Sequence, residues 1–295
     1  MGYEWLALGA AFLWAVASIM SVKPAQHLGT FAYSRWRMGC TSIILSMMAL
    51  ITGGWYSVEW SSISAMALSG LVGIFIGDTA LFACLNRMGP RQAGLLFSCH
   101  AVFSAVLGYF LFSETMTGLE LIGASLVFSG VLTAIFFGRR KQATASLDDI
   151  KGNVWVGIGL GIVAALCQAF GGIIAKPVME TAIDPVAASA IRMIAAFAAH
   201  SALWLTGAKL AKARNAINSN VFIITAVNAF LAMAVGMTLI LYALREGNVG
   251  MVALLSSTTP IMLLPMLWIY TKQRPNRFAW IGAVVAVLGT GILVQ

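Results

Sequence analysis

The sequence predicts an all-α polytopic membrane protein with ten transmembrane helices, arranged as two inverted five-helix repeats. Three observations predict this fold. The 295 residues are 60% hydrophobic and only 9% charged, whereas a soluble protein of this length carries roughly 25% charged residues. Ten apolar stretches are long enough to cross a bilayer, and they fall into two similar groups of five. Because five is odd, the second group must enter the membrane upside down relative to the first.

The apolar stretches are predicted to be helices and not the strands of a barrel. Each runs for about 20 residues, enough to span a hydrocarbon core, and none alternates polar with apolar positions. In lipid every backbone donor and acceptor must be paired internally, which a helix achieves within one segment. The predicted spans are residues 3–22, 31–52, 62–84, 93–112, 118–137, 153–175, 185–206, 220–243, 249–271 and 277–294.

The longest connection, residues 138–152, is the most strongly polar segment of the chain. We interpret it as a linker between a first five-helix repeat, residues 1–137, and a second, inverted one, residues 153–295. A shift of 159 residues places 77–130 over 236–289 without a gap, and this unbroken register supports a duplication. The turn between the third and fourth spans is expected near Met88-Gly89.

The net charge of +8 does not indicate nucleic-acid binding, because the charges lie in short loops between apolar stretches. Of the 18 Lys and Arg residues, fifteen lie on the side of the loops that follow spans one, three, five, seven and nine. Only Lys176, Arg192 and Arg245 lie on the other side. The positive-inside rule therefore predicts a cytoplasmic linker and both termini outside.

Neither a cleaved leader nor a cofactor is predicted. The start, Met1-Gly2-Tyr3-Glu4, lacks the basic flank of a signal peptide, so we expect the first stretch to be a spanning helix. The four cysteines fall inside apolar stretches without disulfide or zinc spacing. No nucleotide-binding loop motif is present, which argues against an ATP-driven pump.

Ionisable residues inside the spans are the main candidates for function, because a charge in hydrocarbon is costly. Asp78 lies well inside the third span and His100 inside the fourth, about equally far from the expected turn. In an antiparallel pair of helices they would lie at nearly one depth. We expect a carboxylate–imidazole pair at a cavity wall, able to carry a proton or hold a cationic group. The structural alternative is that Asp78 anchors a local hydrogen-bond network and His100 faces a loop.

Other polar and aromatic residues could line the same cavity, although packing explains each of them equally well. Amides join helices in membranes, and a lone aromatic residue most often packs. A proline removes a backbone donor and frees a carbonyl, which predicts a kinked ninth helix. The candidates for substrate binding or coupling are Trp14, Gln168, Asn228, Tyr242, Ser257 and Thr258, and the candidates for helix breaks or gating are Pro260 and Pro265.

Arg35, Arg37 and Arg192 lie near the predicted helix ends. We expect these side chains to snorkel to the lipid headgroups. Arg37 and Arg192 recur in both halves, which favours an architectural role over contact with a substrate.

The chain resembles the EamA-type family of the drug/metabolite transporter superfamily. The likeness is carried by Trp14, by the basic residues Arg37 and Arg192, by the stretch from Tyr242 to Pro260, and by Glu114 followed by Gly123. It covers almost the whole chain. It implies the five-plus-five layout and transport of small organic solutes. It also implies that Glu114, at a helix end within a family signature, has a structural role.

The sequence departs from the family pattern at three positions. Ser113 stands where the signature usually has Gly, Gln273 stands at the second-half Glu position, and Ala101 replaces a proline that Pro260 keeps in the second half. Family members usually have both termini in the cytoplasm, whereas the loop charges of this chain predict the reverse.

The leading hypothesis is a secondary active transporter, a permease or exporter of a metabolite or drug-like solute in a bacterial inner membrane. It would work by alternating access, with proton coupling through Asp78 and His100 as one version. We expect a monomer, with a dimer as the alternative. A passive facilitator or an assembly subunit is the second hypothesis. A membrane enzyme acting on lipid is the third, but the ten acidic residues and three histidines are too scattered for a catalytic or metal cluster.

Overall fold

The computed structural model describes residues 2–137, 153–271 and 276–293, and these ranges are built from helices. The predicted linker 138–152 and Gln273 lie outside the described residues. The elements of the first half are α1 (Tyr3–Leu28), α2 (Thr30–Thr52), η1 (Gly54–Ser57), α3 (Trp60–Gly70), η2 (Leu71–Asp78), α4 (Thr79–Ser98), α5 (His100–Phe112) and α6 (Gly118–Phe137). Those of the second half are α7 (Val154–Met179), α8 (Pro185–Leu205), η3 (Lys209–Ala211), α9 (Ser219–Asn228), η4 (Ala229–Gly236), α10 (Met237–Glu246), α11 (Val249–Ser256), α12 (Thr259–Thr271) and α13 (Arg277–Leu293).

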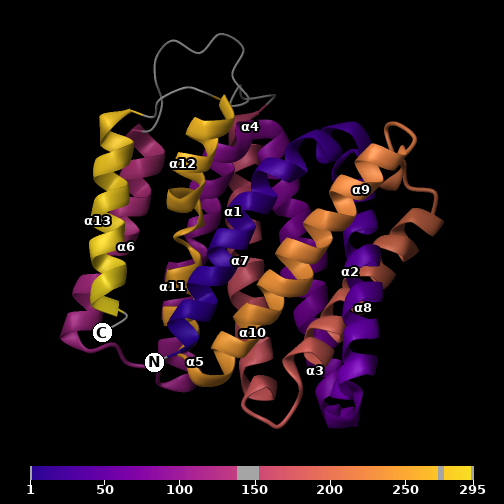
Figure 1. Ribbon diagram of the computed structural model, residues 1–295, viewed down its shortest axis with the longest axis horizontal. Helices are drawn as coiled ribbons and strands as arrows, with labels where there is room; N and C mark the ends of the chain where they lie inside the picture. The colour runs from indigo at the N-terminus through magenta and orange to yellow at the C-terminus, as the bar shows by residue number, and fades with distance from the viewer. Residues whose placement is uncertain (1, 138–152, 272–275, 294–295) are drawn as a thin grey trace.

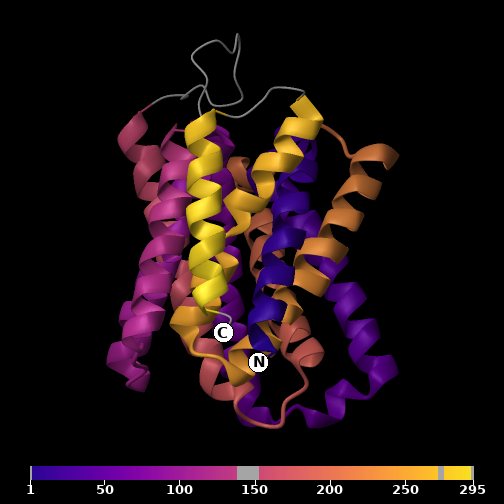
Figure 2. The same cartoon turned by 60° about the vertical axis from the view of Figure 1, so that its left-hand side comes forward.

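Within the described ranges, seven helical segments are long and apolar enough to cross a membrane, which makes the chain a multi-pass membrane protein. Two shorter apolar helices, Gly118–Thr133 and Arg277–Leu293, accompany them. Helix α2 has the length of a span, but Arg35 and Arg37 lower its mean hydropathy. The first turn of α1 and the last turn of α13 lie at the same end of the bundle (Figures 1 and 2).

Two helices continue past the ends that the sequence predicted. Helix α1 runs to Leu28 and α7 to Met179, so that Pro24 and Pro177 lie inside helices. Ending these spans at 22 and 175 was therefore wrong. The lysine that precedes Pro177 is buried and not solvated, which removes the reason to end α7 there. Its ammonium donates hydrogen bonds to the Leu244 and Gly247 carbonyls at the end of α10, at 2.9 and 3.1 Å.

The third and eighth spans each contain a π-helical segment, in which the backbone makes a wider turn than in an α-helix. Segment η2 connects α3 to α4, and η4 connects α9 to α10 at the corresponding place in the second half. The α4 segment bends at Gly89, whose φ of 82° suits glycine, so the turn predicted near Met88-Gly89 is confirmed. The ninth span is interrupted between Ser256 and Thr259.

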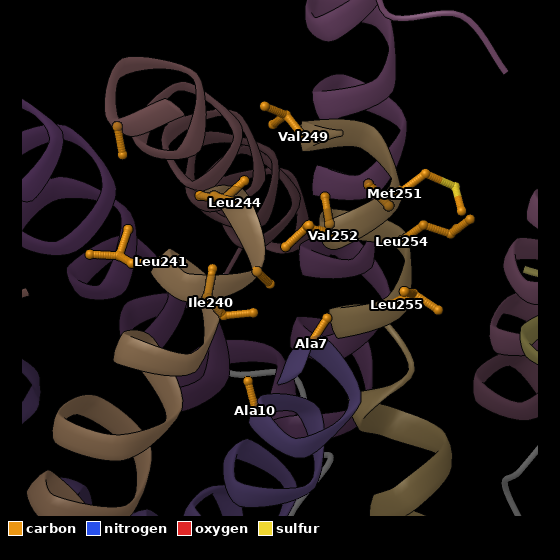
Figure 3. Close-up of a cluster of buried hydrophobic side chains, with 14 of the residues drawn as sticks. Ala7, Ala10, Ile240, Leu241, Leu244, Val249, Met251, Val252, Leu254 and Leu255 are labelled. Carbon is orange, nitrogen blue, oxygen red and sulfur yellow. The ribbon is translucent and has the colours of Figure 1, made fainter. Parts of the chain in front are cut away.

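Helix contacts recur in reciprocal pairs between the halves. Segments α4, η2 and α5 pack on α7, while α10, η4 and α12 pack on α1. Helices α2 and α8 pack directly on each other. In the largest apolar cluster, small residues of α1 (Ala7 and Ala10) lie beside larger side chains of α10 and α11, including Ile240 and Leu255 (Figure 3). The last helix of each half contributes to the same cluster, through Val127 of α6 and Ala286 of α13.

Helices α6 and α13 lie side by side at one edge of the bundle (Figures 1 and 2). Their contact is made by glycines. A Cβ atom on Gly130 would lie 2.6 Å from the carbonyl oxygen of Gly282, and one on Gly289 would lie 2.7 Å from that of Gly123. Such small residues allow two helix backbones to approach closely in lipid, where association depends on packing. The last helices of the two halves therefore support each other.

Glu114 connects the two halves through a helix terminus. Its carboxylate accepts hydrogen bonds from the backbone N–H groups of Val249 at 2.9 Å and Gly250 at 3.4 Å, the first residues of α11. A negative charge at this position satisfies unpaired donors and complements the helix dipole. A side chain on Gly108 would collide with this carboxylate. The role that the resemblance implied for Glu114 is thus a specific one, the capping of a helix in the other half.

We predict that Glu114→Ala lowers the free energy of unfolding by about 1–2 kcal/mol, the usual contribution of a helix cap. Glu114→Gln should cost less, because the amide oxygen still accepts a hydrogen bond. The midpoint of unfolding in mixed micelles of sodium dodecyl sulfate measures both variants. Glu59→Ala, at a residue on the exposed loop before α3, is the matched control, and an equal loss in that variant would contradict the capping role.

Candidate functional site

The centre of the candidate site is a buried ion pair between Arg37 of α2 and Asp78 at the end of η2. The Arg37 and Asp78 side chains are only 6% and 14% exposed. In the described part of the chain the ion pairs are this one and that of Lys176 with Glu180, which lies at a helix end. A charge buried in an apolar bundle must be paired, and intramembrane pairs of this kind often mark transport pathways.

Aromatic rings cover the Arg37 guanidinium. Its central carbon lies 4.7 Å from the centre of the Phe82 ring and 5.6 Å from that of Tyr33. The two rings meet edge to face, with their centres 5.2 Å apart. Cation–π contacts strengthen when they are removed from water. The rings therefore hold Arg37 in position beside Asp78 and separate the pair from lipid.

A second arginine, Arg192 of α8, lies close to the same carboxylate. Its charge interacts with that of Asp78, although no ion pair forms between them. Glycines make this approach possible. A Cβ atom on Gly70 would lie 2.7 Å from the Arg192 Cα, and one on Gly73 would lie 3.4 Å from the Arg192 Nη2. Two buried guanidinium groups thus lie near one carboxylate, which pairs with Arg37.

Further polar groups line this region. The hydroxyl of Thr79, directly after Asp78, is 3.3 Å from Nε2 of His200 on α8. His200 is 2% exposed and packs against the Phe75 ring at 4.7 Å between centres. Several of the buried polar atoms have no hydrogen-bond partner among the described residues. Those in this region are the Tyr33 hydroxyl, the Ser34 hydroxyl, Nε of Arg37, Nε of Arg192 and Nδ1 of His200.

The structure brings Asp78 to Arg37. None of the hydrogen bonds or ion pairs in the described ranges joins Asp78 to His100, the partner that the sequence suggested. His100 opens α5, is 2% exposed, and has its ring centre 5.0 Å from that of Phe97. The His100 ring therefore packs beside an aromatic ring.

Trp14 and Asn228 hold α1 against the α9 and η4 segments. The indole N–H of Trp14 donates to the Ala232 carbonyl within η4, at 2.9 Å. The amide of Asn228 donates to the Ala17 carbonyl in α1, at 2.7 Å. In the other half, the Ser69 hydroxyl donates in the same way to the Gly171 carbonyl in α7, at 2.6 Å. Oδ1 of Asn228 is buried and without a recorded partner, so one end of this amide remains available.

The remaining candidates are dispersed. Gln168 is half-buried on α7, whereas Tyr242 is exposed, with the Arg245 guanidinium 5.9 Å from its ring centre. The hydroxyls of Ser257 and Thr258 donate to carbonyls three residues earlier, at 2.6 and 2.7 Å. These carbonyls lie at the end of α11, where the helix is interrupted. Pro260 is the second residue of α12, and Pro265 lies inside that helix.

The expectation that Arg37 and Arg192 snorkel to headgroups was wrong, since they are 5% and 2% exposed. Each arginine lies seven residues after the first residue of its helix, which corresponds to about 10 Å along the helix axis. An arginine side chain does not easily reach the headgroups from that depth. This position in the sequence could therefore have identified both arginines as buried. His200 and Tyr33 gave no such signal. Arg35 is half-buried and donates to the Ala211 carbonyl at 3.1 Å.

The described residues contain no group of three or more His, Cys, Asp or Glu side chains that could hold a metal ion. Cys40, Cys84, Cys99 and Cys167 form no disulfide bond with one another. The site therefore offers fixed charges, hydrogen-bonding groups without a partner, and aromatic surfaces. Such an arrangement can bind a polar solute or move a charge.

The family model for the EamA-like transporter family matches residues 1–136 and 155–295. The chain belongs to the EamA-like transporter family. It is similar to the "Probable amino-acid metabolite efflux pump" of Escherichia coli (strain K12), with 28% identity over 231 residues, 76% of this chain and 74% of that protein. It is also similar to "Uncharacterized transporter YyaM" of Bacillus subtilis (strain 168), with 23% identity over 287 residues, 95% of this chain and 88% of that protein.

One solved crystal structure has the same fold. It superimposes with a TM-score of 0.78 and covers 98% of this chain and 95% of its own, at 14% identity. The family and the names of the relatives are those of membrane transporters and not of enzymes. The EamA-like chain is accordingly a membrane transporter, and its buried charges belong to a transport protein.

We predict that Arg37→Gln and Asp78→Asn each destabilise this EamA-like protein by about 3–5 kcal/mol, because each leaves an uncompensated polar or charged partner in an apolar interior. The double variant should lose much less than the sum of the two. Unfolding midpoints of the four proteins in mixed micelles give the coupling energy directly. Additive losses would show that the two side chains do not depend on each other.

Proposed function

We propose that this protein is a secondary active transporter that moves a small organic metabolite out of a bacterial cell by alternating access. The observation that carries the proposal is the buried cluster of Arg37, Asp78 and Arg192, in a chain of a transporter family. Fixed charges inside a membrane bundle are costly, and they are retained where a pathway for a polar solute or an ion needs them.

The proposed fold has ten crossings in two inverted halves, residues 1–137 and 153–295, joined by residues 138–152. The three crossings beyond the seven long apolar ones are α2, α6 and α13. The order of elements supports the repeat, since each half has a π-helical segment inside its third span and an interruption inside its fourth. Two such rare features at matching places favour a common origin.

The reciprocal packing supports a two-fold relation between the halves. Equivalent segments exchange partners, so that α4 packs on α7 as α10 packs on α1. Five crossings in each half make the relation an inversion across the membrane. An inverted pair can rock between two states around a site at its interface, which is the physical basis of alternating access.

The proposed substrate is a small metabolite, with amino-acid-like solutes tested first. The name of the Escherichia coli relative, an efflux pump for amino-acid metabolites, supports this choice. The protein is expected to act as a monomer in the lipid bilayer, with a dimer as the alternative, and without nucleic acid.

Asp78 is the proposed coupling residue. Asp78 is the carboxylate of the buried cluster. The residue at the corresponding position of the other half is Met237, so only the first half has a negative charge at this position. Protonation of Asp78 would release Arg37 from its ion pair and change the charge of the cluster. This replaces the sequence-based idea that Asp78 and His100 act as a directly contacting pair.

We predict that Asp78→Asn abolishes accumulation against a gradient in proteoliposomes, while flux down a gradient persists. The initial rate of proton-driven transport should fall about tenfold or more. A tenfold change in rate corresponds to about 1.4 kcal/mol in free energy. The measurement is radiolabelled amino-acid flux with and without an imposed pH gradient. The Arg37→Gln/Asp78→Asn double variant controls for stability. Unchanged uphill transport in Asp78→Asn would refute the coupling role, and its absence in the wild type would favour a passive facilitator.

The proposed orientation places the linker in the cytoplasm and both termini outside. The structure strengthens the charge argument, because the three basic residues on the opposite side are held by protein contacts. Lys176 and Arg192 are buried, and Arg245 donates to the Met179 and Ile183 carbonyls. None of these three is a solvated loop charge of the kind that sets topology.

We predict that a cysteine introduced at Ser146 in the linker is labelled by an impermeant maleimide only after cells are permeabilised. A cysteine at Tyr56, which is 97% exposed in the loop after α2, should be labelled in intact cells. The two positions control for each other. Labelling with the opposite pattern would reverse the proposed orientation.

A further inference from the structure

Arg192 is a buried cation without a counterion of its own. It is 2% exposed, and its Nε has no hydrogen-bond partner. Within the described ranges it forms no ion pair, because Asp78 already pairs with Arg37. An arginine does not lose its proton in proteins, so this charge cannot be removed by titration. The cluster therefore carries one positive charge more than its own residues neutralise.

The excess arises from the difference between the two halves. Arg37 and Arg192 occupy corresponding places near the starts of α2 and α8. Asp78 serves the first arginine, whereas Met237 stands where the second half would need its own carboxylate. An unpaired guanidinium in an apolar interior is strongly unfavourable. Its retention calls for an anion that arrives from outside the chain.

The surroundings of Arg192 include a close contact between η2 and α7, where Gly73 and Gly171 pack backbone against backbone. The guanidinium lies beside this contact. Its Nη2 and the Cys167 carbonyl oxygen would lie 3.4 and 3.6 Å from a Cβ atom on Gly73. The next residue in the sequence, Gln168, is half-buried. Close to the guanidinium, the described residues place backbone groups but no ion-pair partner.

We propose that Arg192 binds the carboxylate of the transported solute, so that the substrates are small organic acids, including zwitterions. This proposal rests on the proposed transport function and names its substrate class. The planar guanidinium donates two parallel hydrogen bonds to a carboxylate, the strongest pairing open to it. The solute supplies the missing negative charge, and Asp78 keeps Arg37 from competing for it.

The test compares carboxylates with their uncharged primary amides. The probes are acetate, benzoate and N-acetyl-leucine, each beside acetamide, benzamide or N-acetyl-leucinamide. The thermal unfolding midpoint of the purified protein in nanodiscs is measured with each, because binding to the folded state raises it. We expect at least one acid to raise the wild-type midpoint more than its amide does. In Arg192→Gln that difference should disappear. Equal shifts by every acid and amide in the wild type, or an acid-specific shift that survives in Arg192→Gln, would overturn the proposal.

The unliganded proteins separate a binding role from a structural one. Removing a charge that has no partner should leave the midpoint of Arg192→Gln equal to or above that of the wild type. Removing a paired charge, in Arg37→Gln, should lower it. Arg192→Lys keeps the charge but loses the paired donors, and it should retain only part of the acid-specific shift. Arg35→Gln is the matched control, since Arg35 is half-buried on α2 and bonded to a carbonyl, and it should retain the whole shift. A large loss of unliganded stability in Arg192→Gln would indicate a structural role.

Flux in proteoliposomes distinguishes failure of this inference from failure of the proposed function. Wild-type protein that binds acids over amides but transports neither would refute the transport proposal and leave Arg192 as an anion site. If wild-type protein transports amides as fast as acids, and Arg192→Gln transports both at about the wild-type rate, the carboxylate site is refuted. The transport proposal then remains in place.

Discussion

The burial of charge within an apolar bundle is the constraint on which the rest of this structure depends. Arg37 and Asp78 must lie in contact, because neither side chain is tolerable alone at its depth. That contact fixes α2 against η2, and Arg192 of α8 lies close by, next to Gly70 and Gly73. Glycines at 70 and 73 permit the close approach. Helices α2 and α8, which pack directly on each other, lie beside this cluster.

The two halves share their architecture but not their charges. Both have a π-helical segment followed by an interrupted helix, and both use a polar side chain to bind a carbonyl of the other half's first helix. Charge is distributed unequally, since the cluster has two arginines and one carboxylate, which pairs with Arg37. A symmetric scaffold with an asymmetric centre can rock between two shapes while it binds a solute in one orientation, which is what a transporter built from inverted halves requires.

Charged side chains also join helices at their ends, and the contact of Glu114 joins the two halves. Glu114 caps α11, Lys176 binds the carbonyls that end α10, and Arg245 binds those near the end of α7. In each case a charged side chain satisfies backbone groups that have no partner within their own helix. Charges that sequence patterns assign to loops and headgroups therefore act as joints between helices.

The sequence by itself determined that the chain spans a membrane with helices, because apolar runs of about 20 residues admit no other solution. It also identified Asp78, the turn at Gly89, and a transporter family. It could not find that Asp78 pairs with Arg37 and not His100, or that Arg192 is buried. Apolar helices have similar faces, so the rotation of each about its axis leaves no periodic signal. Only tertiary packing, through glycine contacts and π-helical turns that reorient a face, decided which polar side chains meet.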